Sequence, residues 1–193
     1  MKSEIFLTLA IISFLASTNL TAQSFVDPAL GFTLENDYAR YVFEPVGMGL
    51  SFMTDKMTGY NHIDKVTGEH LLWEIIFGKG TQRPSINNNY KPCSYASHIK
   101  NKEGDQVLIL EWNDLRFWEE DSICSVRAIV KLPANDGVAR WNISVSNRSD
   151  YWGLWEVSCP SVNGFPADGK YDIATPVTGT GGHPLKNWSG VFK

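Results

Sequence analysis

The chain has few of the residues from which metal and redox centres are built. It contains four histidines and three cysteines in 193 residues. No His-x-His pair and no His-Glu-x-x-His motif occurs, and the cysteines Cys93, Cys124 and Cys159 are far apart in the sequence. A zinc or copper site needs three or four such ligands in one place. We therefore predict no metal site and no cofactor.

The common motifs of nucleotide binding and nucleophilic catalysis are absent as well. The glycine-rich stretch Gly179-Thr180-Gly181-Gly182 lacks the Lys-Ser/Thr pair that follows in a phosphate-binding loop, so a turn is the better interpretation. No Gly-x-Ser-x-Gly motif is present. The formal net charge is −4 and no basic cluster occurs, which argues against nucleic acid as a partner.

The one long apolar run lies at the N-terminus. Lys2 is followed by a mostly apolar segment from Ile5 to Ala16, and Leu20-Thr21-Ala22 then ends in a small residue. A run of about a dozen residues is too short to cross a bilayer, and the pattern is typical of a cleaved signal peptide. We expect residues 1–22 to be this signal peptide and residues 23–193 to form one domain. The protein is then secreted or periplasmic, without a membrane span after cleavage; an uncleaved anchor or a buried helix is the alternative.

The clearest structural signal is a two-residue alternation of apolar and polar side chains. It runs from Ser122 to Leu132 and again from Ala139 to Asn147, with the turn-forming Asn135-Asp136-Gly137 between them, which predicts a hairpin. No apolar stripe of helical period follows residue 23. About nine strands at short spacing predict an all-β, antiparallel β-sandwich. The expected strands are Phe32–Glu35, Tyr38–Phe43, Met48–Thr54, Leu71–Phe77, Ser94–Lys100, Gln106–Trp112, Ser122–Leu132, Ala139–Asn147 and Tyr151–Val162.

Three further expectations concern loops, strand burial and thiols. The segment from Arg83 to Pro92 is expected to be a long loop, either a site of binding residues or a tolerated insertion. The strand Gln106–Trp112 is apolar on both faces, so we expect it to be covered on both sides. The three cysteines are expected to be buried and unpaired, and the alternative is one disulfide with one thiol left over.

Aromatic residues are the most distinctive part of the composition, with seven Trp, seven Tyr and ten Phe. Exposed Trp and Tyr rings often mark recognition sites and can stack on sugars. We take Trp118, Trp152, Trp155 and Glu156 as candidate carbohydrate contacts. Trp152 and Trp155 have opposite parity, so a regular strand cannot point both inward. The alternative is that the aromatic residues fill the core and that Glu156 simply faces solvent.

Carboxylates are the residues with which glycoside hydrolases act, usually as a pair. Candidates are Glu111, Asp114, Glu156 and the run Glu119-Glu120-Asp121, and a charge run beside a turn is usually a solvated surface. No pair among them can be assigned to catalysis, so the catalytic residues stay unknown.

Two stretches resemble a known family. The first contains Leu34-Glu35-Asn36, Pro45 to Gly49, and Asp55-Lys56-Met57-Thr58-Gly59, and the second runs from Arg140 to Gly164. They resemble the galactose-mutarotase-like supersandwich domains that precede the catalytic barrel in several bacterial glycoside hydrolases. The second stretch is similar in particular to glycoside-hydrolase-like proteins of Bacteroidetes.

The resemblance implies a secreted carbohydrate-active protein in which the sandwich supports a following (β/α)₈ barrel. The catalytic carboxylates of such proteins lie on the barrel. Because the sequence stops at Lys193, we expect a fragment that lacks this catalytic domain and that supports or shapes an oligosaccharide or polysaccharide site. The alternatives are a stand-alone carbohydrate-binding module and a mutarotase-like or epimerase-like enzyme, for which neither His98 nor His183 can be matched to a catalytic role.

Overall fold

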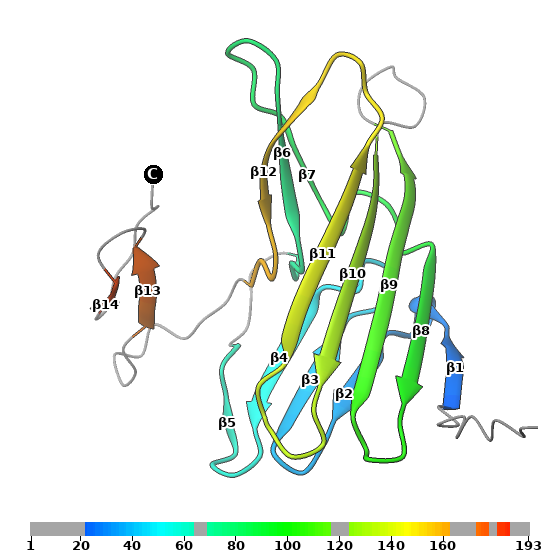
Figure 1. Ribbon diagram of the computed structural model, residues 1–193, viewed down its shortest axis with the longest axis vertical. Helices are drawn as coiled ribbons and strands as arrows, with labels where there is room; N and C mark the ends of the chain where they lie inside the picture. Colours follow the sequence, from blue (N-terminus) through cyan, green and yellow to red (C-terminus); the bar gives the residue numbers. More distant parts are fainter. Residues whose placement is uncertain (1–21, 64–68, 117–123, 163–172, 178–180, 186–193) are drawn as a thin grey trace, which may run out of the picture.

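The computed structural model describes residues 22–63, 69–116, 124–162, 173–177 and 181–185, and it is an antiparallel β-sandwich (Figure 1). This confirms the all-β fold class. Apart from strands, these residues form a single 3₁₀ turn, η1 (Pro28–Leu30), which Asp27 caps by accepting a hydrogen bond from the Ala29 N–H at 3.0 Å. No helix among them is long and apolar enough to cross a bilayer. The predicted signal peptide lies outside the described residues except for Ala22.

The largest sheet, sheet A, has five antiparallel strands in the order β1-β8-β9-β10-β11. Their bounds are β1 Ala22–Val26, β8 Tyr95–Lys100, β9 Gln106–Leu115, β10 Cys124–Leu132 and β11 Arg140–Asn147. Every second residue of β10 is buried, and β10 pairs with β11 from Cys124 opposite Asn147 to Lys131 opposite Arg140. The predicted hairpin is therefore confirmed.

Two smaller sheets form the rest of the sandwich. Sheet B has the order β2-β3-β4-β5, and sheet C has the order β12-β6-β7. Sheet B consists of β2 Phe32–Glu35, β3 Ala39–Phe43, β4 Leu50–Asp55 and β5 Tyr60–Asn61. Sheet C consists of β6 Glu74–Gly78, β7 Ser85–Asn87 and β12 Gly153–Ser158. A separate hairpin joins β13 (Ile173–Val177) to β14 (Gly181–Leu185), so half of the predicted glycine-rich turn is strand.

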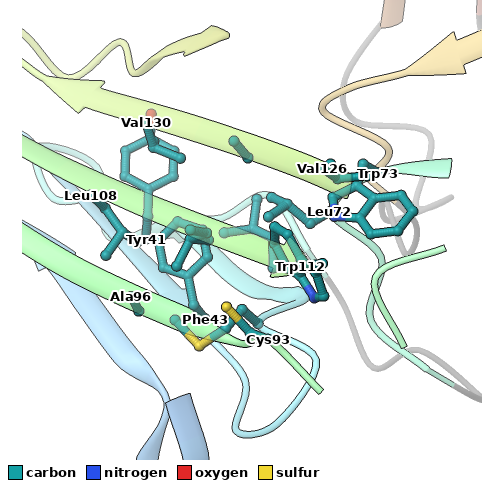
Figure 2. Close-up of a cluster of buried hydrophobic side chains, with 14 of the residues drawn as sticks. Tyr41, Phe43, Leu72, Trp73, Cys93, Ala96, Leu108, Trp112, Val126 and Val130 are labelled. Atoms are coloured by element: carbon teal, nitrogen blue, oxygen red, sulfur yellow. The ribbon is translucent and has the colours of Figure 1, made fainter. Parts of the chain in front are cut away.

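One hydrophobic core joins all three sheets. Tyr41 and Phe43 of β3 face the buried side chains of β8, β9 and β10, among them Leu108 and Val130 (Figure 2). At the other end of this cluster the rings of Trp73 and Trp112 meet edge to face, with centroids 5.3 Å apart and an interplanar angle of 81°. Trp73 directly precedes β6 and Trp112 belongs to β9, so this contact ties sheet C to sheet A.

Hydrogen bonds from Asn36 join the turns at one end of the sandwich. Its Oδ1 accepts from the N–H groups of Tyr38 and Ala39, both at 2.8 Å, and so forms the β2–β3 turn. Its Nδ2 donates to the carbonyl oxygens of Pro133 at 2.6 Å and Asp136 at 2.8 Å, which lie in the β10–β11 turn. One side chain therefore holds sheet B against the end of the main hairpin.

The segment from Arg83 to Pro92, which was expected to be a long loop, is partly strand and partly core. β7 lies within it, and Asn88 is fully buried. The Asn88 Oδ1 accepts from the Leu72 N–H at 2.7 Å, and its Nδ2 donates to the carbonyl oxygens of Gly47 and His70, each at 3.1 Å. All of these partners belong to the protein, so Asn88 has a structural role and is not available for a ligand.

Two other expectations have different outcomes. All three cysteines are free, with Cys93 and Cys124 buried and Cys159 half-buried, which confirms that they are unpaired. The expectation that the Gln106–Trp112 strand is covered on both faces is wrong. Val107 and Ile109, on its outer face, are only half-buried.

Candidate functional site

The four predicted carbohydrate contacts fall in different surroundings. Trp118 lies outside the described residues. Trp152 is 7% exposed and packs in the hydrophobic core, whereas Trp155 is 63% exposed and Glu156 is exposed as well. The structure therefore places Trp155 and Glu156, but not Trp152, at a surface that a ligand can reach.

A β-bulge brings Trp155 and Glu156 onto one face of sheet C. Leu154 pairs with Phe77 and Glu156 with Ile76, so Trp155 is the extra residue between them. Gly78 lies on the same face as Ile76 because residues two apart in a strand share a face. A Cβ atom on Gly78 would lie 3.2 Å from the Trp155 ring, which places that ring on this outer face. In a regular strand, neighbouring residues such as Trp155 and Glu156 point to opposite faces. The bulge removes this alternation, so both lie on the same face.

Two cations lie on exposed aromatic rings of this face. The Arg83 guanidinium is centred 3.7 Å from the Trp155 ring centroid, and the Lys79 Nζ is 4.7 Å from that of Tyr151. Both cations come from the connection between β6 and β7. We call Lys79, Arg83, Tyr151 and Trp155 the aromatic–cation face.

A second surface is a groove of about 510 Å³ beside the edge strand β11. We call it the Trp141 groove. Its lining residues are Tyr38, Ala39, Tyr41, Met53, Thr54, Asp55, Met57, His62, Gly137, Val138, Ala139 and Trp141. They come from β3, β4, the adjoining turns and His62 after β5 on one side, and from the β10–β11 turn and the start of β11 on the other.

The groove exists because sheet B does not cover β11 fully. Trp141, Ile143 and Val145 face inward as predicted, yet all three are only half-buried. The Trp141 ring meets the Tyr41 ring edge to face, with centroids 6.2 Å apart. The Tyr41 hydroxyl donates to the Gly137 carbonyl at 2.7 Å and accepts from the Ala139 N–H at 3.2 Å, which fixes the opposite wall.

Polar groups line the rim of this mostly apolar groove. The Asp55 carboxylate accepts from the Thr58 hydroxyl and from the Met57 N–H, each at 2.8 Å. These hydrogen bonds, with a smaller contribution from the nearby His62, hold the pKa of the Asp55 carboxyl below its ordinary value. Asp55 is thus a fixed, ionised hydrogen-bond acceptor. The Thr54 hydroxyl, the His62 ring and the exposed Tyr38 supply further polar atoms.

The sequence predictions did not include the Trp141 groove. Trp141 was expected to face inward on its strand, and it does. Which strand lies at the edge of a sheet depends on pairing between distant segments, and no local pattern gives this information. The sequence shows only an inward Trp followed by the apolar, β-branched Ile143 and Val145, and a fully covered strand has the same pattern.

The described residues support a catalytic or metal site less well than they support a binding surface. No group of three or more His, Cys, Asp or Glu side chains there could hold a metal ion. His98 has a neutral partner, with its Nε2 3.2 Å from the Gln106 Oε1, and burial lowers its pKa. Of the predicted carboxylates, Glu111 pairs with Arg127 and Asp114 with Arg148, whereas the run 119–121 lies outside the described residues.

No protein-family model, curated protein or solved structure matches this chain. Its site is therefore interpreted from geometry. Two surfaces combine exposed aromatic rings with polar groups, and both are suited to binding a ligand.

Proposed function

We propose that this chain is the β-sandwich domain of a secreted, glycoside-hydrolase-like carbohydrate-active protein, and that its Trp141 groove binds part of an oligosaccharide or polysaccharide. In this role the domain supports or shapes the saccharide site of a catalytic domain that belongs to the same protein. The observation that carries the proposal is the composition of the groove, which has an aromatic floor and a polar rim.

The groove has the physical properties that a sugar ligand requires. Its volume of about 510 Å³ lies within the range of small-molecule pockets, roughly 300–1,000 Å³. Sugars present apolar C–H faces and hydroxyl groups at their edges. Tyr38, Tyr41 and Trp141 offer apolar ring surface, and Asp55 and His62 offer hydrogen-bonding atoms near the rim.

The stretches that carry the family resemblance meet at this groove. Tyr38 and Tyr41 belong to the first stretch, as do Asp55 and Met57, and Trp141 belongs to the second stretch. Residues about one hundred positions apart in the chain are thus brought to one concavity. This meeting supports the proposal that the resemblance concerns a saccharide site.

The experiment is affinity gel electrophoresis of the full chain on a panel of neutral polysaccharides, followed by calorimetry with oligomers of any that retard it. We expect Trp141→Ala and Tyr38→Ala each to weaken binding about tenfold or more, as is usual for an aromatic anchor. Phe25→Ala is the matched control, because Phe25 is an exposed aromatic residue on β1, away from the groove.

Two results would overturn the proposal. One is the absence of retardation on every polysaccharide of the panel. The other is binding that Tyr38→Ala and Trp141→Ala leave as strong as Phe25→Ala does. Tyr38 is partly exposed, so its variant keeps the test valid if Trp141→Ala disturbs the fold.

A further inference from the structure

The arginine of the aromatic–cation face is held in a fixed position, and some of its N–H donors remain unused. Two hydrogen bonds from the Arg83 Nη1, to the carbonyl oxygens of Gly80 at 2.8 Å and Gln82 at 2.7 Å, anchor the guanidinium over the Trp155 ring. No described residue accepts from its Nε or Nη2. A stacked guanidinium keeps its in-plane donors free for a carboxylate or sulfate, since stacking uses only the face of the group.

The lysine of this face lies near two aromatic rings. The Lys79 Nζ lies 4.7 Å from the Tyr151 ring centroid and 5.9 Å from that of Trp152. Tyr151 is 65% exposed, and Trp155 is 63% exposed although Arg83 covers one of its faces. Each of these two rings must therefore present another part of its surface to solvent.

Lys79 and Arg83 differ from five other cations of the described structure in having no acidic partner. Each of these five pairs with a carboxylate within 4.0 Å, and they are Arg40, Lys56, Arg127, Lys131 and Arg148. No carboxylate among the described residues lies at such a distance from Lys79 or Arg83. Two positive charges are thus left without an ion pair on a face that also carries the exposed rings of Tyr151 and Trp155 and the exposed carboxylate of Glu156.

We propose that the aromatic–cation face is a second saccharide site that takes an acidic glycan, with a uronate carboxylate or a sulfate ester bound by Lys79 and Arg83. The sugar ring packs on the exposed surface of Trp155 or Tyr151. Glu156 lies on the same face, opposite Ile76, which is two residues from Gly78 in β6. In this proposal its carboxylate accepts a hydrogen bond from a sugar hydroxyl. The inference shares only the saccharide class of ligand with the proposed function and uses other residues.

The number of charges and the aromatic rings favour a glycan over other polyanions. Nucleic-acid binding proteins typically neutralise about 6–10 phosphates, and two cations supply too few contacts for this. An acidic peptide offers carboxylates but no flat C–H face to stack on the rings. An acidic polysaccharide has both features in every repeating unit.

The test is calorimetry of the full chain with galacturonic acid oligomers and with the same oligomers after complete methyl esterification. We expect the acid to bind about tenfold more tightly than the ester, since the ester keeps the sugar rings and loses the charge. Lys79→Gln and Arg83→Gln should each reduce this ratio several-fold. Lys102→Gln, which removes an exposed lysine in the β8–β9 turn, should leave it unchanged. A sulfated galactan in a parallel titration tells a sulfate preference from a carboxylate preference.

Equal affinity for acid and ester, with no preference for sulfate, would overturn this inference. Equal binding of polyglutamate or of single-stranded DNA would overturn the saccharide assignment. Lys79→Gln breaks no hydrogen bond of the fold, so the test stands even if Arg83→Gln disturbs the hairpin. Tyr38→Ala in the Trp141 groove should not change the acid-to-ester ratio. A third outcome would separate the two proposals. If Tyr38→Ala loses binding to neutral polysaccharides while the wild type shows no preference for the acid, the proposed function stands and this inference alone is refuted.

Discussion

Replacing Asn88 by alanine should destabilise the fold strongly, although the residue lies outside every strand. The substitution removes the acceptor of the Leu72 N–H and a donor to the Gly47 carbonyl. The His70 carbonyl keeps one donor, because the Asn89 Nδ2 lies 2.9 Å from it. The Trp73 N–H loses the same acceptor, at 3.4 Å. Three backbone groups therefore lose a partner, and each of the two with the shorter bonds costs about 1–3 kcal/mol.

The expected loss is about 3 kcal/mol in the free energy of unfolding, which for a domain of this size lowers the Tm by roughly 6–12 °C. Thermal unfolding followed by circular dichroism, with urea titration as a second measure, checks both values. Asn142→Ala is the matched control, because Asn142 is exposed on β11, and its effect should stay within about 0.5 kcal/mol.

Asn88→Asp separates hydrogen bonding from the loss of volume. It keeps an acceptor for the Leu72 N–H but turns the donor toward Gly47 and His70 into a second acceptor. At neutral pH it also buries a charge, so it should destabilise at least as much as Asn88→Ala. A Tm for Asn88→Ala within about 2 °C of that for Asn142→Ala, or a wild-type Tm for Asn88→Asp, would refute the reasoning.

Two further predictions concern strain and thiols. Val46, with φ 71° and half its surface exposed, is a β-branched residue in the left-handed region, so Val46→Gly should stabilise the fold by about 1 kcal/mol in urea unfolding. Val138→Gly, at an exposed valine without a positive φ, should destabilise it, and a loss of stability in both variants would contradict the strain argument. Burial raises the pKa of each of the three cysteine thiols from 9.0 to about 11. Between pH 9 and 11 the unfolded state then binds fewer protons than the folded state. The contribution of the thiols to stability is therefore full below pH 9 and falls as the pH rises above it. Constant stability from pH 8 to 10.5 would count against this.

The regular strands could be predicted because their alternation is local. The hairpin from Cys124 to Asn147 follows from side-chain period and turn residues alone, and the observed pairing agrees with it. The strand Phe32–Glu35 was predicted with its observed bounds. In each case burial on one face imposes a pattern that neighbouring residues reveal.

The missed strands are those whose pairing partner is distant or whose residues are polar. β1 pairs with β8, about seventy residues away, and β7 contains Ser85 and Asn87 and pairs with β6. Their sequences are short and do not alternate clearly. For the same reason Asn88 could be named only as part of a loop, although its contacts make it a central residue of the core.

The candidate site was predicted in part. Exposed aromatic residues in the Tyr151–Trp155 cluster were expected, and Trp155 is one. The bulge at Trp155 and the stacking of Arg83 depend on how β12 meets β6, and the Trp141 groove depends on β11 being an edge. These features come from pairing between segments, so the sequence contains the residues but not their arrangement.

Both surfaces follow from the division of the second layer into two short sheets. β9 has ten residues and would extend about 33 Å, whereas the strands of sheets B and C have at most six residues and extend about 20 Å or less. One short sheet cannot cover the length of sheet A, so sheet B packs at one end, where Tyr41 and Phe43 lie, and sheet C at the other, where Trp73 meets Trp112. Coverage beside β11 is then incomplete, which leaves the Trp141 groove. Sheet C keeps its outer face free, which leaves Trp155 and Arg83 at the surface. The incomplete cover of sheet A by two short sheets thus determines which aromatic residues are buried in the core and which are accessible to a ligand.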